Sequence, residues 1–267
     1  MRRRRAEDLP RSSVRIAAVG DFHCGEGDAG KYRDRFAQAN DQADVLVLAG
    51  DLTNLGTPGE MQVVVEELRD VEIPIVAVLG NHDHETGHVE EISEILCSAG
   101  VHLLNGDSWT LDDQVGFVGT KGFVGGFGRH ALTAFGEAGL KDLVGNAMED
   151  VKKLEGSLSH LGTPVRIAVL HYAPIAATVI GEPEQIWAFL GTDRLAEPLD
   201  RYDVSACFHG HAHIGAFEGQ TPGGCPVFNV SLPLLSKHGI GDLYYLHEVP
   251  IPAPAELAAS SIFPESA

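Results

Sequence analysis

Apolar residues in the N-terminal half of the chain gather in short, nearly continuous runs, each followed by a polar cluster and a helical pattern. The runs cover residues 14–19, 45–49 and 73–79. Their separation of roughly 30 residues is the length of a βαβ unit. Because the runs lack polar alternation, they predict strands buried on both faces of a parallel or mixed sheet. The predicted helices are residues 33–42, 61–70 and 89–99.

The pattern changes after residue 101 to shorter strands and turns. Two short runs flank Asp112 and Asp113, which is typical of a hairpin. A helix is predicted at 140–159, and further strands at 109–111, 115–119, 165–170, 204–208, 227–230 and 243–249. We therefore predict the α/β class, as a four-layer α-β-β-α sandwich with two mixed β-sheets. The expected organisation is a flexible arm at 1–13, a single domain at 14–250 and a disordered Pro- and Ala-rich tail at 251–267.

Charge and composition exclude several classes of protein. The formal net charge is -19, so long nucleic acids, which need clustered Lys and Arg, are not expected as substrates. No apolar run is long enough to span a membrane. The basic residues 1–5 are followed by a polar segment rather than the apolar core of a secretion signal, which predicts a cytoplasmic protein. The four cysteines form no C-x-x-C pair, which argues against a zinc ribbon or a redox motif.

Each apolar run ends at residue types that bind metals. These clusters are Asp21-Phe22-His23, Gly50-Asp51, Gly80-Asn81-His82-Asp83, His171 and Gly210-His211-Ala212-His213. Ligands of open α/β sheets bind outside the carboxyl ends of the strands, so the five clusters are expected to converge on one crevice. Any one of them alone is more often a surface loop, a turn or a hydrogen-bonded core histidine. Five in order, each at a strand end, predict a metal centre.

Spacing within two of the clusters suggests how the ligands are aimed. Residues i and i+2 on an extended backbone point to the same side, so Asp21 and His23 are expected to share a site. The same spacing relates His211 and His213. Nitrogen and oxygen donors without thiolate favour Mn, Fe, Zn or Ni over Ca.

The ordered motifs D-x-H, G-D, G-N-H-D, a solitary His and G-H-x-H resemble the calcineurin-like metallophosphoesterase superfamily, over about residues 14–230. The resemblance implies two metal ions, with Mn and/or Fe expected and Zn or Ni as alternatives. The first metal would be held by Asp21, His23, Asp51 and His213. Asp51 would bridge to the second metal, which Asn81, His171 and His211 complete. A hydroxide bridging the metals would then attack phosphorus in line.

Two further residues complete the predicted catalytic set. His82, the third residue of Gly-Asn-His-Asp, matches the superfamily's general acid, which protonates the leaving group. Many relatives carry an acidic residue three positions after the bridging aspartate, where this chain has Asn54. The amide oxygen of Asn54 is expected to accept the imidazole N–H of His82, but it stabilises an imidazolium less than a carboxylate does.

Substrate contacts are predicted from the stretches between the metal motifs. Asn81 and His82 are expected to reach the phosphate, and residues 172–187 to form a rim. The Gly-rich stretch 121–130 offers a wall of aromatic and cationic side chains, namely Phe123, Phe127, Arg129 and His130. A plain Gly-rich connection with core phenylalanines and solvated charges explains this stretch equally well.

These features favour a phosphodiesterase acting on a small nucleotide-type diester. A phosphomonoesterase, either a nucleotidase or a protein phosphatase, is the alternative within enzymes. A non-catalytic metal-binding scaffold is the alternative from another class, and a homodimer is left open.

Overall fold

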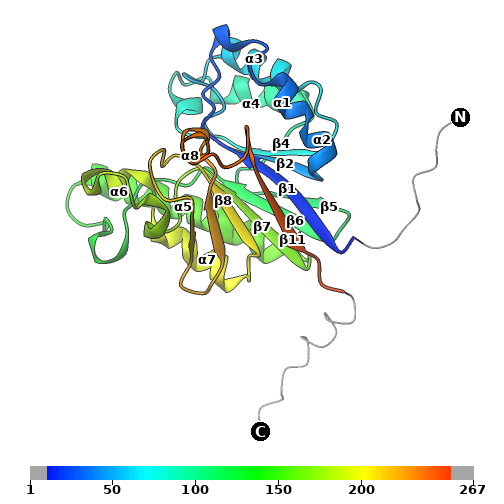
Figure 1. Cartoon of the computed structure of the whole chain (residues 1–267). Helices are drawn as coiled ribbons and strands as arrows, with labels where there is room; N and C mark the ends of the chain where they lie inside the picture. Colours follow the sequence, from blue (N-terminus) through cyan, green and yellow to red (C-terminus); the bar gives the residue numbers. More distant parts are fainter. Residues whose placement is uncertain (1–10, 254–267) are drawn as a thin grey trace, which may run out of the picture.

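The computed structural model describes residues 11–253 (Figure 1). The expected disorder of the tail therefore concerns mostly residues outside this range, and the same holds for most of the N-terminal arm. Within that arm, strand β1 (Ser13–Val19) already begins at Ser13. No helix of residues 11–253 combines the length and hydrophobicity needed to cross a bilayer.

The first sheet contains the three strands predicted in the N-terminal half of the chain. In space its strands follow the order β11 (Tyr245–Pro250), β1, β2 (Val45–Ala49), β3 (Ile75–Val78) and β4 (His102–Leu103). Pairing is parallel from β1 to β4, whereas β11 runs antiparallel to β1. The carboxyl ends of β1, β2 and β3 therefore meet at one edge of the sheet.

The second sheet is also mixed. Its order is β5 (Ser108–Leu111), β6 (Val115–Thr120), β7 (Val165–Leu170), β8 (Ala206–His209), β10 (Pro226–Asn229) and β9 (Glu218–Gln220). The central pairs are parallel, and β5 and β9 are antiparallel edge strands.

Helices cover the outer faces of both sheets (Figure 1). Those on the first sheet are α1 (Arg33–Ala37), α2 (Ala39–Gln42), α3 (Pro58–Leu68) and α4 (Val89–Ser98). Those on the second sheet include α5 (Ala138–His160) and α7 (Ala196–Arg201). Side chains alternate along the second sheet: Phe117 joins the core shared with the first sheet, and Val118 packs with the α5 side. The predicted four-layer architecture is confirmed.

Several elements differ from the sequence prediction. The helix predicted at 33–42 divides at Gln38, whose N–H bonds to the carbonyl of Arg35, a 3₁₀-type contact. Helix α3 begins at Pro58, earlier than expected, because Thr57 caps the Glu60 N–H and proline fits the first turn. The elements that were not predicted are β4, β9, α6 (Trp187–Leu190), α7 and α8 (Leu232–His238). All five are too short to show a periodic pattern.

Candidate metal centre

The loops that follow β1, β2, β3, β7 and β8 bring the predicted ligands together at one end of the two sheets. Three overlapping groups have donor atoms within 4.8 Å of one another. They are Asp21, His23 and His213; His23, Asp51 and His82; and Asp51, His171 and His211. Asn81 adds its side-chain oxygen to the third group, 2.9 Å from His171 Nε2.

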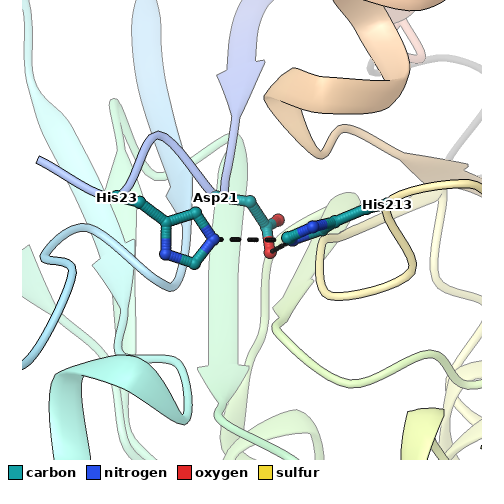
Figure 2. A group of neighbouring side chains, drawn as sticks. All are labelled: Asp21, His23 and His213. Atoms are coloured by element: carbon teal, nitrogen blue, oxygen red, sulfur yellow. Dashed lines mark hydrogen bonds and ion pairs between the residues drawn. The ribbon is translucent and has the colours of Figure 1, made fainter.

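The first group joins the loops after β1 and β8 (Figure 2). His213 Nε2 lies 3.0 Å from Asp21 Oδ1, and His23 Nε2 lies 3.5 Å from His213 Nε2. Both carboxylate oxygens of the buried Asp21 also accept the backbone N–H of His211 at 3.0 Å. His23 Nδ1 is buried and has no hydrogen-bond partner among the described residues. This ring therefore lacks a strong hydrogen bond that would fix it, and a cation bound at this group would supply the missing interaction.

The third group is oriented by a backbone carbonyl. His171 Nδ1 lies 3.0 Å from the carbonyl oxygen of Ala49, so Nδ1 carries the proton and Nε2 offers its lone pair. That lone pair faces Asn81 Oδ1 at 2.9 Å and Asp51 Oδ1 at 3.4 Å. Three acceptor atoms thus converge without a donor between them. A shared cation would satisfy all three.

His211 and His213 belong to different groups although they are two residues apart. His211 Nε2 donates to the carbonyl of Phe189 at 3.1 Å, which leaves Nδ1 free for the group of Asp51 and His171. His213 instead turns to Asp21. His211 is thus grouped with Asp51 and His171, and His213 with Asp21 and His23.

The expectation of ligands aimed by extended backbone is wrong. Asp21, His23, Asp51 and His211 have positive φ values of 56°, 44°, 50° and 69°. They make up four of the seven non-glycine residues with positive φ in the described part of the chain. L-residues adopt this left-handed conformation rarely and at a cost, and such strain concentrates at functional sites. The ligands are therefore placed by sharp turns after the strands.

His82 belongs to the second group, which shares His23 with the first group and Asp51 with the third. Its backbone N–H donates to Asp51 Oδ1 at 2.8 Å, and its ring centroid is 4.4 Å from that of His23. Its Nδ1 lies 2.7 Å from the backbone carbonyl oxygen of Asn54. The expected partner was the side-chain amide of Asn54. The backbone supplies the acceptor instead, because the loop after β2 passes beneath the imidazole.

Asp83, which the sequence analysis did not single out, connects two of the ligand loops. Its fully buried carboxylate accepts the N–H of Gly80 at 2.8 Å and the N–H and hydroxyl of Thr53 at 2.9 and 2.6 Å. The loop after β2 is thereby fixed to the loop after β3. Its position as the last residue of Gly-Asn-His-Asp was the available signal.

The hydrogen bond to Asp21 raises the pKa of His213. Burial acts in the other direction on two other histidines of these groups. It lowers the pKa of His211 to about 3 and that of His23 to about 4, so both rings are neutral and can donate lone pairs. Burial alone would raise the pKa of Asp21, but its hydrogen bond to His213 and the neighbouring histidines hold that pKa below its ordinary value. Burial raises the pKa of Asp51, and the charge of Asp21 adds to the shift. Neutral imidazoles beside crowded carboxylates form a donor set that fits metal ions without thiolate.

The predicted substrate residues occupy two places. Phe123 packs edge-on against Tyr172, at a centroid distance of 6.0 Å, and Tyr172 lies 4.4 Å from the ring of His211. Phe123 is therefore near the metal groups. Phe127, by contrast, packs with Trp187 on the apolar group formed by Ala173, Val179, Leu190 and Ala212.

The other two predicted substrate contacts are exposed. Arg129 Nε donates to His130 Nε2 at 3.1 Å, and His130 lines a cavity together with Phe127. The structure thus brings Phe123 toward the metal groups and places Arg129 and His130 further along the same segment, in the 3₁₀ turn Gly128–His130.

Two mixed sheets between helical layers, with Asp and His side chains clustered at the strand ends, are the features of a metal-dependent phosphoesterase. The family model for calcineurin-like phosphoesterases matches residues 14–215, and the chain belongs to this family. A search of curated protein sequences found no match.

Solved structures support the fold. Phosphopantetheinyl hydrolase (PptH) from Mycobacterium tuberculosis aligns over 91% of this chain and 98% of its own, with a TM-score of 0.62 and 16% identity. TT1561 of Thermus thermophilus aligns over 90% and 99%, with a TM-score of 0.53 and 13% identity. GAP50, the anchor in the inner membrane complex of Plasmodium, aligns over 84% and 73%, with a TM-score of 0.51 and 15% identity.

Proposed function

We propose that this phosphoesterase holds two metal ions and hydrolyses a small nucleotide-type phosphodiester. The observation that carries the proposal is that the two carboxylate oxygens of Asp51 face histidines of the first and the third ligand group. Its Oδ2 lies 3.9 Å from His23 Nε2, and its Oδ1 lies 3.4 Å from His171 Nε2. A carboxylate whose two oxygens face different histidines is suited to bridge two cations.

Two bound cations, Mn and/or Fe with Zn or Ni as alternatives, would supply an activated water and neutralise phosphoryl charge. The protein supplies the geometry and the proton. His82 is proposed to protonate the leaving oxygen through Nε2, since its Nδ1–H is held by the Asn54 carbonyl. Asn81 is proposed to contact the phosphate as well as a metal ion.

A diester is preferred to a monoester on grounds of charge. The chain carries a formal net charge of -19. A diester brings one negative charge to the site, whereas a monoester brings up to two. The diester is thus the easier anion to accommodate.

Two assays test the proposal. Elemental analysis of the purified protein should find two metal ions per chain, and bis(p-nitrophenyl) phosphate should be hydrolysed faster than p-nitrophenyl phosphate. The Asp51→Asn variant should lose both metal and activity. One metal ion per chain would contradict the bridging role of Asp51, and faster monoester turnover would establish a phosphomonoesterase.

A non-catalytic scaffold is the second candidate, because the fold also occurs in a protein described as an anchor. Full metal occupancy without hydrolysis of either activated ester would favour it.

A further inference from the structure

Exposed apolar side chains concentrate at the end of the molecule that carries the metal centre. Seven large apolar residues of the described chain are strongly exposed. Leu246 lies on β11. The other six follow the carboxyl ends of β2, β6, β7 and β8: Leu55, Phe135, Ile180, Ile186, Phe189 and Ile214. Such a distribution marks an apolar border around the site.

Three of these residues form one side of that border, here called the apolar rim: Ile180, Phe189 and Ile214. Ile214 directly follows His213, and its N–H donates to Glu182 Oε1 at 2.8 Å, which ties it to the segment of Ile180. The backbone carbonyl of Phe189 accepts from His211 Nε2. The side chains of Ile180 and Phe189 are each 58% exposed. Ile214 is thus the sequence neighbour of one proposed ligand, His213, and the backbone of Phe189 contacts another, His211.

Beyond the apolar rim the same segment borders a cavity whose lining includes aromatic and alanine side chains together with His130 and Glu184. Trp187 and Ala188, next to Phe189, line a cavity of about 550 Å³ together with Phe127 and Ala176. A larger cavity of about 840 Å³ shares Phe127 and Ala176 with it. Both volumes lie within the range of pockets for small molecules. Residues 187–189 thus border the smaller cavity and, through the carbonyl of Phe189, also contact His211.

We propose that the substrate carries an apolar arm, aliphatic or aryl, on the phosphate oxygen that is not cleaved, and that this arm lies on the apolar rim. The inference rests on the proposed phosphodiesterase function and narrows its substrate class. A soluble amphiphilic diester fits better than a membrane surface, because the net charge of -19 is repelled by anionic lipid. The arm gains affinity from apolar burial while the phosphate lies at the metals.

The test uses a series of alkyl p-nitrophenyl phosphates with methyl, butyl and octyl arms, kept below their micelle concentrations. Water adds to phosphorus and the P–O bond to p-nitrophenolate breaks in each, so only the arm changes. We expect kcat/KM of the metal-loaded protein to rise about twofold per added methylene, about half the free energy of full burial. The Ile180→Ser variant should flatten the slope of log kcat/KM against the number of methylenes, whereas Ile180→Met should keep this slope. Leu246→Ser removes an apolar side chain of similar exposure away from the site, and it should not change the slope.

Each variant is judged by the ratio of its kcat/KM for the octyl ester to its kcat/KM for the methyl ester. A general loss of activity therefore does not affect the result. A wild-type slope of zero, with the methyl ester still hydrolysed, overturns the inference and leaves the proposed function intact. No hydrolysis of any ester in the series by the metal-loaded protein removes both. A wild-type dimer that Ile180→Ser converts to a monomer in size-exclusion chromatography would make the rim an interface between copies and overturn the inference. Equal binding of wild type and Ile180→Ser to the octyl ester would overturn it as well.

Discussion

His82 is held by the backbone of Asn54, not by its side chain: the imidazole Nδ1 lies 2.7 Å from the carbonyl oxygen of Asn54. The backbone N–H of Asn54 in turn donates to the carbonyl of Cys24 at 3.2 Å. The ring orientation is thus set by main-chain geometry. The identity of the residue at position 54 becomes secondary for the tautomer of His82.

The first prediction separates these two residues. Asn54→Ala should leave kcat within about threefold, because the carbonyl acceptor is retained. His82→Ala should lower kcat by about 10²-fold or more, the usual contribution of a general acid. Metal content, measured by elemental analysis, should stay unchanged in both. A large loss in Asn54→Ala would show that the amide takes part, and an active His82→Ala would remove His82 from the mechanism.

A second prediction concerns the buried Asp83. Both carboxylate oxygens of Asp83 act as hydrogen-bond acceptors, and their donors include the Gly80 N–H and the Thr53 N–H and hydroxyl. Asp83→Asn would turn an NH₂ group against one of these donors and should lower the free energy of unfolding by about 2 kcal/mol. Urea denaturation measures the change. Asp142→Asn, on the exposed face of α5, is the matched control and should have little effect.

A third prediction compares two glycines that have similar backbone φ angles. Gly50 and Gly100 have φ values of 84° and 88°. A Cβ at Gly50 would lie 2.6 Å from His171 Nδ1, whereas a Cβ at Gly100 would meet nothing within 4 Å. Both alanine variants incur the left-handed strain, of roughly 1 kcal/mol. Only Gly50→Ala should also displace His171 and reduce bound metal; equal metal contents in the two variants would contradict the role of this close approach.

The strand ends carrying the motifs could be predicted from the sequence because long buried strands leave continuous apolar runs. The candidate ligands followed from the polar residues at those ends. What could not be predicted depends on tertiary contacts. The left-handed turns at Asp21 and His211 leave no periodic pattern, and neither does the carbonyl of Ala49 that orients His171. Asp83 stood within a recognised motif, but its role becomes visible only when the loops of Thr53 and Gly80 meet.

A last prediction concerns stability and pH at the opposite end of the first sheet. Asp44 accepts from Arg11 Nη1 at 2.8 Å and from the backbone N–H of Arg15 at 2.9 Å. Burial alone would raise the pKa of Asp44, but its hydrogen bonds with Arg15 and Arg11 hold it below the ordinary value of 3.8. Since the folded pKa is the lower one, the folded state gains stability above pH 3.8 and loses it as the pH falls through the folded pKa.

Asp44→Asn should therefore lower the free energy of unfolding at pH 7 by about 1 kcal/mol, a modest value because both arginines are partly exposed. The difference from wild type should shrink as the pH is lowered below 3.8. Urea denaturation of metal-free wild type and variant at several pH values measures it, and the titration of the histidines around the site cancels in the difference between the two proteins. Asp34→Asn, which changes a carboxylate on α1 outside this ion pair, serves as control. A difference that stays constant down to pH 3 would show that the carboxylate charge of Asp44 contributes nothing, leaving its hydrogen-bond geometry as the source of stability.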